Sequence, residues 1–220
     1  NYFIDTLEDL LEKRKKGPEH TFALAFLDLN RFRTINDSLG HSMGDHLIRR
    51  VAKRLSAMTG EGDLIGHFGG DEFAFILHGV GDAGSATAFA EQVVKEIAEP
   101  FRFKSRHVYT SVSVGIALCG LEHSKAQEIL RDADMAMYHA KDNGERYCIF
   151  DKEMHTSAVS QQQMETDLRY AIVCNELEIF YQPIIDLDKM FLSGFEALVR
   201  WNHPRRGLMS PTDFIPLSEE

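Results

Sequence analysis

The sequence Gly-Gly-Asp-Glu at residues 69–72 constrains the fold of this chain more than any other feature, because it lies between two short apolar runs. Residues 63–68 and 73–77 have the length of strands, so the two glycines predict the tip of a β-hairpin. Glycine adopts positive φ there and lets a ligand approach the backbone. Two adjacent carboxylates leave this turn. The stretch alone allows two interpretations, a bound cation or a solvated surface hairpin.

A second polar cluster follows an apolar run at residues 21–29, which has the length of a buried strand. The run contains one charged residue, Asp28, near its C-terminal end, where a metal ligand or a catalytic acid is a reasonable expectation. Residues 30–45 are then dense in Asn, Asp, Gly and Arg. The presence of two separate acidic clusters favours the cation interpretation of the hairpin.

Composition narrows the class of protein. The 220 residues are enough for one ordinary domain and a fragment of another. A net charge of -10 argues against a nucleic-acid backbone as partner. The absence of a membrane-length apolar run and of a signal peptide predicts a cytoplasmic segment without membrane contact. Cys119, Cys148 and Cys174 are scattered, which predicts reduced core thiols, and the histidines form no metal-binding motif, which predicts no zinc site.

Periodicity predicts helices alternating with strands, and therefore an α+β fold with a sheet layered by helices. Ser42 and Asp45 resemble a capping box at the start of one helix. The predicted helices cover residues 2–16, 43–58, 85–99, 125–141 and, after a polar stretch at 151–162, 164–172, with a further helix start in 207–220. The predicted strands outside the hairpin cover residues 21–29, 108–118, 147–150, 179–184 and 195–201.

The two polar clusters together resemble the GGDEF family of diguanylate cyclases. Residues 28–37 read Asp-Leu-Asn-Arg-Phe-Arg-Thr-Ile-Asn-Asp, followed by Gly-His at 40–41, Gly-Asp at 44–45 and Gly-Gly-Asp-Glu-Phe at 69–73. The resemblance covers about residues 2–150. It implies a palm-like sheet of the nucleotidyl-cyclase type and the condensation of two GTP molecules into cyclic di-GMP. It also implies a homodimer for catalysis and an upstream sensory domain, in bacterial second-messenger signalling.

The resemblance also implies roles for individual residues. Magnesium or manganese would be held by Asp28, the carbonyl of Leu29, Asp71 and Glu72. Catalytic roles fall to Asp71, Glu72 and Arg33; either carboxylate could deprotonate the 3′-hydroxyl group. Substrate binding falls to Asn36 and Asp45 for guanine, the backbone of Asn30, Arg31 and Phe32 for phosphates, and Lys141 with Arg146 for the terminal phosphate. Asp45 as a helix cap and Lys141 as a solvated charge remain alternatives.

Three positions depart from the family pattern. Arg33 stands where lysine is usual, His67 replaces a common arginine, and Glu145 stands where a phosphate-binding arginine is expected. These changes leave the expected metal ligands intact. The intact acids favour an active cyclase, whereas His67 and Glu145 favour an alternative function, a catalytically weak GTP-binding domain that regulates an attached phosphodiesterase.

The C-terminal residues resemble the start of an EAL-type cyclic di-GMP phosphodiesterase domain. The motif Glu-Ala-Leu stands at residues 196–198, and Gln182 matches a substrate-contacting position. A TIM-like barrel needs about 250 residues, so this fragment is expected to lack phosphodiesterase activity by itself. The predicted division is a cyclase domain at 1–151, a connector helix at 152–175 and a truncated EAL domain at 176–220.

Overall fold

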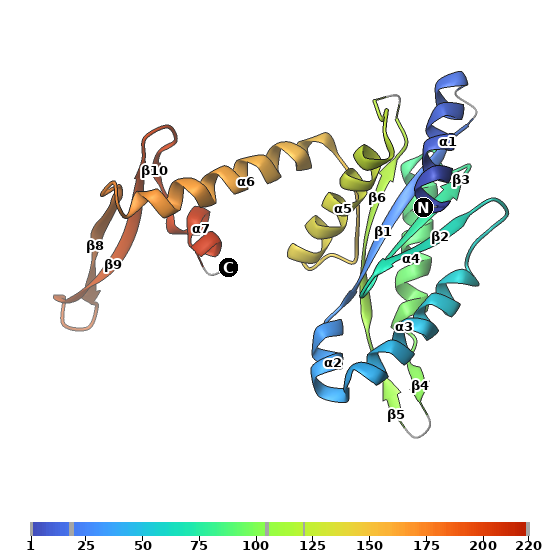
Figure 1. The fold of residues 1–220 in the computed structure, drawn as a ribbon. Helices are drawn as coiled ribbons and strands as arrows, with labels where there is room; N and C mark the ends of the chain where they lie inside the picture. Colours follow the sequence, from blue (N-terminus) through green and yellow to red (C-terminus); the bar gives the residue numbers. More distant parts are fainter. Residues whose placement is uncertain (1, 18–19, 104–105, 121, 219–220) are drawn as a thin grey trace. The chain divides into compact units, whose positions relative to one another are not determined.

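A five-stranded sheet with the order β2-β3-β1-β6-β7 forms the centre of the first of two units (Figure 1). The computed structural model describes residues 2–17, 20–103, 106–120 and 122–218. Its two compact units are residues 1–155 and 156–220, and each is described by itself. None of the helices in the described ranges combines the length and the apolar composition that crossing a bilayer requires.

The first unit alternates helices and strands, as the periodicity predicts. The elements in chain order are α1 (Tyr2–Lys16), β1 (Phe22–Asn30), α2 (Phe32–Leu39), α3 (His41–Ser56), β2 (Leu64–Gly69), β3 (Glu72–His78), α4 (Ala83–Ala98), β4 (Phe101–Phe103), β5 (Arg106–Val108), β6 (Ser111–Leu118), α5 (Ala126–Asp142), β7 (Tyr147–Ile149) and α6 (Lys152–Ala171), which continues into the second unit. Strand β1 is antiparallel to β3 and β6, whereas β7 runs parallel to β6.

Helices cover both faces of the sheet, and two hydrophobic clusters fill the space between them and the strands. On one face, apolar residues of α3 and α4 pack against alternate residues of the strands, including Leu27 and Leu29 of β1. On the other face, α1 and α5 pack against Phe22, Leu24 and Phe26 of β1. Because side chains alternate along a strand, Asp28 lies on the same face as Phe26, which is the face that α5 covers.

Gly115 of β6 determines how closely α5 approaches the sheet. A Cβ atom at this position would lie 2.0 Å from the backbone nitrogen of Met137 and 2.1 Å from the carbonyl oxygen of Ala133, both in α5. The backbone of the helix therefore lies directly over the glycine, a contact that only a residue without a side chain permits. The position of α5 matters for the site, because its C-terminal half carries Lys141.

The first unit differs from the sequence prediction in two places. The strand predicted at 108–118 is shorter: β6 begins only at Ser111, whereas Val108 is the last residue of β5, which pairs with β4 in a separate two-stranded sheet. The alternation of apolar residues persists through this change of partner, so the pattern could not detect it. The second difference is α2, an eight-residue helix within the polar stretch, for which no helix is predicted.

The predicted capping box of α3 is wrong. The helix begins at His41 and its N-cap is Gly40, with φ of 85° and no capping hydrogen bond from a side chain. Ser42 and Asp45 therefore lie inside the helix. The error arises because α2 and α3 follow each other directly, whereas the sequence interpretation treats the preceding residues as a loop. Asp45 therefore does not cap the helix. This excludes the alternative explanation for Asp45, and its ligand-binding role stays a prediction.

The second unit contains the C-terminal part of α6 and a three-stranded sheet with the order β10-β9-β8. Its remaining elements are β8 (Leu177–Asp186), β9 (Phe191–His203), β10 (Gly207–Met209), the helix α7 (Pro211–Phe214) and a 3-10 helix (Pro216–Ser218). The predicted helix start in 207–220 is thus preceded by a strand, and residues 219 and 220 lie outside the described ranges.

A small core holds this unit together. Trp201 is fully buried with Ala171, Met209 and Phe214, and its indole nitrogen donates to a Glu176 carboxylate oxygen at 3.0 Å. Most of β8 remains exposed, with large apolar side chains on its surface. Cys174 is also exposed, so the prediction that all three cysteines are core thiols is wrong for this residue.

Candidate active site

Asp28 and the Asp71–Glu72 pair meet at one end of the central sheet. Asp28 pairs with Glu72 across β1 and β3, and its side chain is only 11% exposed. The backbone N–H of Leu29 donates to the carbonyl oxygen of Asp71 at 3.3 Å, which joins the hairpin turn to the end of β1. Carboxylates from two separate motifs of the sequence therefore lie together in the structure.

Helix α5 places one acid and one base over this cluster. Lys141 donates through Nζ to Oδ1 of Asp28 at 2.6 Å. Asp134 lies seven residues earlier, two turns back on the same face of the helix, and its charge acts on Asp28 and Glu72. The cluster therefore contains four carboxylates and the ammonium of Lys141.

The charged groups of this cluster shift one another's pKa values. Desolvation, and then the nearby charge of Asp28, raise the pKa of Asp71. Desolvation raises the pKa of Glu72, with repulsion from Asp134, Asp28 and Asp71 adding to it. Burial lowers the pKa of Lys141, but its hydrogen bond and attraction to Asp28 more than offset this, so the net change is upward. The single ammonium of Lys141 balances only part of the negative charge of the four carboxylates. A divalent cation bound among them would balance the rest.

We expect Asp71→Asn to stabilise the metal-free chain at neutral pH. A carboxyl group whose pKa is raised by folding binds protons more tightly in the folded state, so its contribution to stability declines as the pH rises above the ordinary carboxyl range. Removing the charge of Asp71 removes that decline. Thermal melting in a chelator should show a rise of about 2 °C at pH 7 and a smaller difference near pH 4. The exposed Asp9→Asn on α1 serves as control, and a lower melting temperature for Asp71→Asn at pH 7 would contradict the expectation.

The hairpin tip has the predicted geometry. Gly69 and Gly70 both have positive φ, 124° and 54°, and neither would bring a Cβ atom into contact with other residues. The His67 ring stacks on Phe73 with centroids 4.7 Å apart, and its Nε2 lies 3.1 Å from the carbonyl oxygen of Gly70. His67, which the sequence comparison marks only as a departure from the family, therefore braces the turn that presents Asp71.

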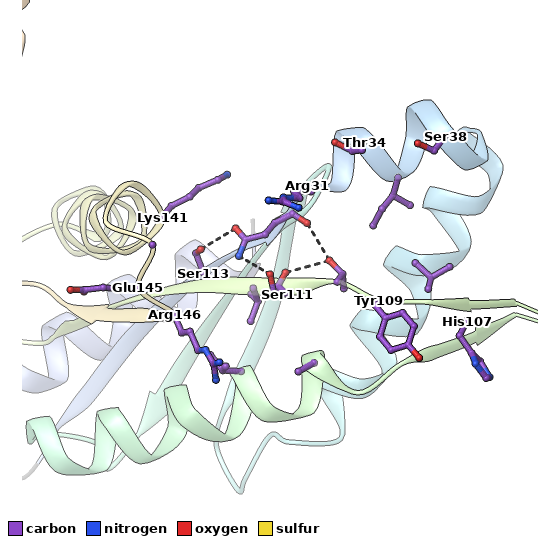
Figure 2. Close-up of a pocket in the computed structure, with 18 of the residues that line it drawn as sticks. Arg31, Thr34, Ser38, His107, Tyr109, Ser111, Ser113, Lys141, Glu145 and Arg146 are labelled. Atoms are coloured by element: carbon purple, nitrogen blue, oxygen red, sulfur yellow. Dashed lines mark hydrogen bonds between the residues drawn. The ribbon is translucent and has the colours of Figure 1, made fainter. Parts of the chain in front are cut away.

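A cavity of about 1020 Å³ adjoins the carboxylate cluster through Lys141, which belongs to both (Figure 2). Residues lining it come from the end of β1, from α2 and α4, from β5 and β6, and from the end of α5 and its turn into β7: Asn30, Arg31, Thr34, Ile35, Ser38, Leu39, Val94, Ala98, His107, Val108, Tyr109, Thr110, Ser111, Val112, Ser113, Lys141, Gly144, Glu145 and Arg146. The cationic side chains of Arg31, Lys141 and Arg146 make this lining suitable for phosphate groups.

Asn30 is held at the edge of the cavity by two serines of β6. Its side-chain amide donates to Ser111 Oγ at 3.1 Å and its Oδ1 accepts from Ser113 Oγ at 3.0 Å. Both polar groups of the Asn30 side chain therefore bind residues of β6, which leaves the backbone of residues 30–32 as the predicted phosphate contact.

Arg31 has the left-handed conformation, with φ of 59°, and α2 begins directly after it at Phe32. This conformation costs a residue other than glycine about 1–3 kcal/mol of conformational free energy. Such strained residues are often found at binding sites. The first N–H groups of a helix lack intrahelical partners and attract anions. Arg31 and one face of α2 line the cavity, and the phosphate-binding role of residues 30–32 stays a prediction.

Asn36 and Asp45 lie outside the lining of this cavity. Oδ1 of Asn36 is buried without a hydrogen-bond partner among the described residues. The same atom lies 1.8 Å from where a Cβ atom of Gly44 would stand, so α2 and α3 meet closely at these two residues. A buried acceptor without a partner costs about 1–3 kcal/mol, and a ligand that donates to it would relieve this.

Arg33 is not brought to the carboxylate cluster. Its side chain is 95% exposed, and its Nε lies 4.0 Å from an Asp37 carboxylate oxygen. Its catalytic role stays a prediction.

The sequence analysis did not identify Asp134. Its spacing of seven residues from Lys141 within a helical segment indicates that both residues share one face of the helix.

Two family models match the chain. The model described as "Diguanylate cyclase, GGDEF domain" matches residues 1–147, and the model described as "EAL domain" matches residues 165–220. The two matches follow each other in the order that the two motifs predict.

Two relatives in Pseudomonas aeruginosa match nearly the whole chain. The bifunctional diguanylate cyclase/cyclic di-GMP phosphodiesterase MucR is 39% identical over 98% of this chain and 31% of its own length. The cyclic di-GMP phosphodiesterase NbdA is 34% identical over 99% of this chain and 27% of its own length. The chain thus spans about a third or less of these curated relatives.

A solved structure supports the fold of the first unit. The crystal structure of the GGDEF domain of YfiN (also called TpbB) from Pseudomonas aeruginosa is 34% identical, with a TM-score of 0.64, over 68% of this chain and 94% of that domain. The palm-like α+β fold with helices flanking a central sheet, expected from the motifs, is therefore confirmed for this unit.

Proposed function

The chain belongs to the GGDEF family of diguanylate cyclase domains, and we propose that its first unit condenses two molecules of GTP into cyclic di-GMP with release of pyrophosphate, in bacterial second-messenger signalling. One observation carries the proposal: Asp28, Asp71 and Glu72 come from separate motifs and meet at one end of the sheet, with Lys141 bound to Asp28 at 2.6 Å. The adjoining cavity contains cationic side chains suited to a triphosphate.

The carboxylates of this cluster fit a hard divalent cation, magnesium or manganese. Asp28, Asp71, Glu72 and the carbonyl of Leu29 offer the oxygen ligands that such ions prefer, and desolvation followed by repulsion between the carboxylates raises the pKa values of Asp71 and Glu72. The cation would neutralise charge on the phosphates and place them for in-line attack.

One of the same carboxylates would also act as the general base. Each 3′-hydroxyl oxygen forms a bond to the α-phosphorus of the other GTP, the bond from that phosphorus to the bridging oxygen breaks, and pyrophosphate leaves. The hydroxyl proton passes to Glu72 or to Asp71. Both carboxyl groups have raised pKa values, which brings a base closer to the neutral pH at which it works best.

Phosphate and base recognition are assigned to different parts of the site. The first N–H groups of α2 and the ammonium of Lys141 would hold the terminal phosphates, together with Arg146, which also lines the cavity. Asn36 and Asp45 would hold the guanine. The buried, unpartnered Oδ1 of Asn36 supports this, because an amino group of guanine could donate to it.

A second candidate is a GTP-binding domain that regulates an attached phosphodiesterase without rapid turnover. Glu145 favours it, because this residue of the cavity lining supplies no positive charge where the family pattern has a phosphate-binding arginine. Some relatives of the same organisation are named phosphodiesterases. Both candidates place GTP in the same site and differ in whether the chain forms product.

The second unit is proposed to be the beginning of an EAL domain, joined to the cyclase domain by α6. The remainder of a barrel would cover the exposed apolar side chains of β8, among them Phe180, Tyr181 and Ile184. In the full-length protein, a sensory domain before the chain and this phosphodiesterase domain after it would be the partners, and two cyclase domains would form a homodimer around two GTP molecules.

Incubation with GTP and magnesium, followed by chromatography, tests the function. We expect cyclic di-GMP, formed at a rate per chain that falls about tenfold for each tenfold dilution below the dimerisation range, because two chains must meet. Calorimetry with GTP runs in parallel. Binding without product at high protein concentration would favour the regulatory candidate, and no binding would exclude both. A rate per chain that stays constant on dilution of a demonstrated monomer would contradict the two-copy requirement.

A further inference from the structure

A second set of potential metal ligands lies where α5 turns into β7. His139, Glu145 and Cys148 each offer one donor atom, and these three atoms lie within 4.8 Å of one another. The Cys148 sulfur is 3.8 Å from Nδ1 of the His139 ring. The three residues come from the last turn of a helix, a loop and a strand, which explains why no motif spacing in the sequence revealed them.

Backbone hydrogen bonds hold the three donors in place. The N–H of Asn143 donates to the carbonyl of His139 at 3.1 Å, and the N–H of Glu145 donates to the carbonyl of Ala140 at 2.8 Å, which closes the end of the helix. Cys148 is paired with Gly115 in the parallel β6–β7 ladder. Figure 2 shows the Glu145 side chain directed away from Ser111 and Ser113, so its carboxylate does not point into the centre of the cavity.

We propose that His139, Glu145 and Cys148 form a binding site for a divalent transition metal of borderline softness, Zn²⁺ foremost, with water as the fourth ligand. Bond lengths of ~2.3 Å to sulfur and ~2.05 Å to nitrogen place two tetrahedral ligands about 3.6 Å apart. The sulfur–nitrogen distance of 3.8 Å is close to this, so small side-chain rotations complete the geometry. His139 and Glu145 are exposed and Cys148 is half-buried, which leaves a path for the ion and for water.

The donor set selects this class of metal over magnesium. Thiolate and imidazole ligands suit Zn²⁺, whereas Mg²⁺ and Ca²⁺ require oxygen ligands. A thiolate, a carboxylate and a neutral imidazole carry two negative charges, which the ion cancels. Desolvation and the charge of Glu145 raise the pKa of the Cys148 thiol, so binding releases its proton to solvent and strengthens as the pH rises.

Titration of the whole chain with Co²⁺ tests the site, because a cysteine thiolate bound to cobalt gives a charge-transfer band in the near ultraviolet that oxygen and nitrogen ligands do not give. Excess Mg²⁺ is present throughout to occupy the carboxylate cluster around Asp28. We expect a band that saturates at one ion per chain, weakens at lower pH and is displaced by Zn²⁺. His139→Ala should weaken Co²⁺ binding about 100-fold or more, because it removes a ligand.

Cysteine variants provide the matched comparison. Cys148→Ser should abolish the band, whereas Cys174→Ser, which alters an exposed cysteine of the second unit, should retain it. Zn²⁺ should also raise the melting temperature of the unaltered chain and of Cys174→Ser, but not of Cys148→Ser. Absence of a band in the unaltered chain, a band that survives in Cys148→Ser, or unchanged affinity in His139→Ala would overturn the proposal.

Discussion

Asp71→Asn should leave the chain folded and reduce magnesium-dependent formation of cyclic di-GMP about 1000-fold. The asparagine keeps the shape of the side chain but removes a negative charge that interacts with Asp28 of the neighbouring strand β1. Charge stabilisation by a catalytic metal amounts to several kcal/mol, and each 1.36 kcal/mol corresponds to about a factor of ten in rate. Product chromatography at saturating GTP measures the loss.

The melting behaviour of the same variant separates a lost ligand from a lost fold. Because removal of this charge relieves repulsion in the metal-free chain, the variant should melt no lower than the unaltered chain at neutral pH. Asp9→Asn, an equivalent change on the exposed face of α1, should change neither turnover nor stability. Turnover of Asp71→Asn within a few-fold of the unaltered chain would remove Asp71 from the proposed metal site.

Comparison with Glu72→Gln tests which of the two carboxylates, Asp71 or Glu72, is the general base, a question that the sequence leaves open. Loss of a metal ligand raises the magnesium concentration needed for half-maximal rate, whereas loss of the base lowers the rate even at saturating magnesium and removes the acidic limb of the pH profile. If Glu72 is the base, its variant should show the second pattern and Asp71→Asn should show the first. The reverse result would exchange the two roles.

Gly115→Ala should destabilise the first unit by about 3 kcal/mol and lower its melting temperature by about 10 °C. The added methyl group would stand 2.0 Å from the nitrogen of Met137 and 2.1 Å from the carbonyl oxygen of Ala133. These are backbone atoms, so no side-chain rotation relieves the overlap and α5 must move off the sheet. Lys141 and Asp134 move with it, so turnover should fall as well.

Gly194→Ala is the matched control for this prediction. Gly194 also lies within a strand, β9, and a Cβ atom there would have no neighbour within 4 Å. The control should therefore retain the melting temperature and the turnover of the unaltered chain. An equal effect of both substitutions would show a general intolerance of strand glycines, and an unchanged Gly115→Ala would show that α5 can move at no cost.

The sequence predicted the parts of the fold that short-range patterns encode. The apolar run ending in Asp28 is β1, the paired glycines are a hairpin turn, and the 3.6-residue period around Met137 is α5. Their meeting at one end of the sheet could be predicted only through resemblance to a family, because no local pattern specifies the register that sets Asp28 opposite Glu72. That register depends on packing across the whole sheet.

The features that the sequence did not predict depend on contacts between distant segments. The change of partner between β5 and β6 leaves the alternation of apolar residues intact, so the period indicates one strand where the structure has two. The juxtaposition of His139 with Cys148 likewise requires the helix end to fold back onto a parallel strand. Residue type gives the chemistry of such groups, but only the folded chain gives their distance.

The ion pair between Lys141 and Asp28 has a kinetic consequence. If Lys141 binds the terminal phosphate as proposed, a cation bound by Asp28 and the incoming phosphate would compete with its 2.6 Å contact to Asp28, and the lysine would exchange at least part of this contact in each cycle. The exchange costs least when a divalent cation and the nucleotide arrive together, because the carboxylate and the ammonium then each find a new partner in one event. Binding should accordingly follow a preferred order, in which the metal–nucleotide complex enters as one species and free nucleotide enters slowly.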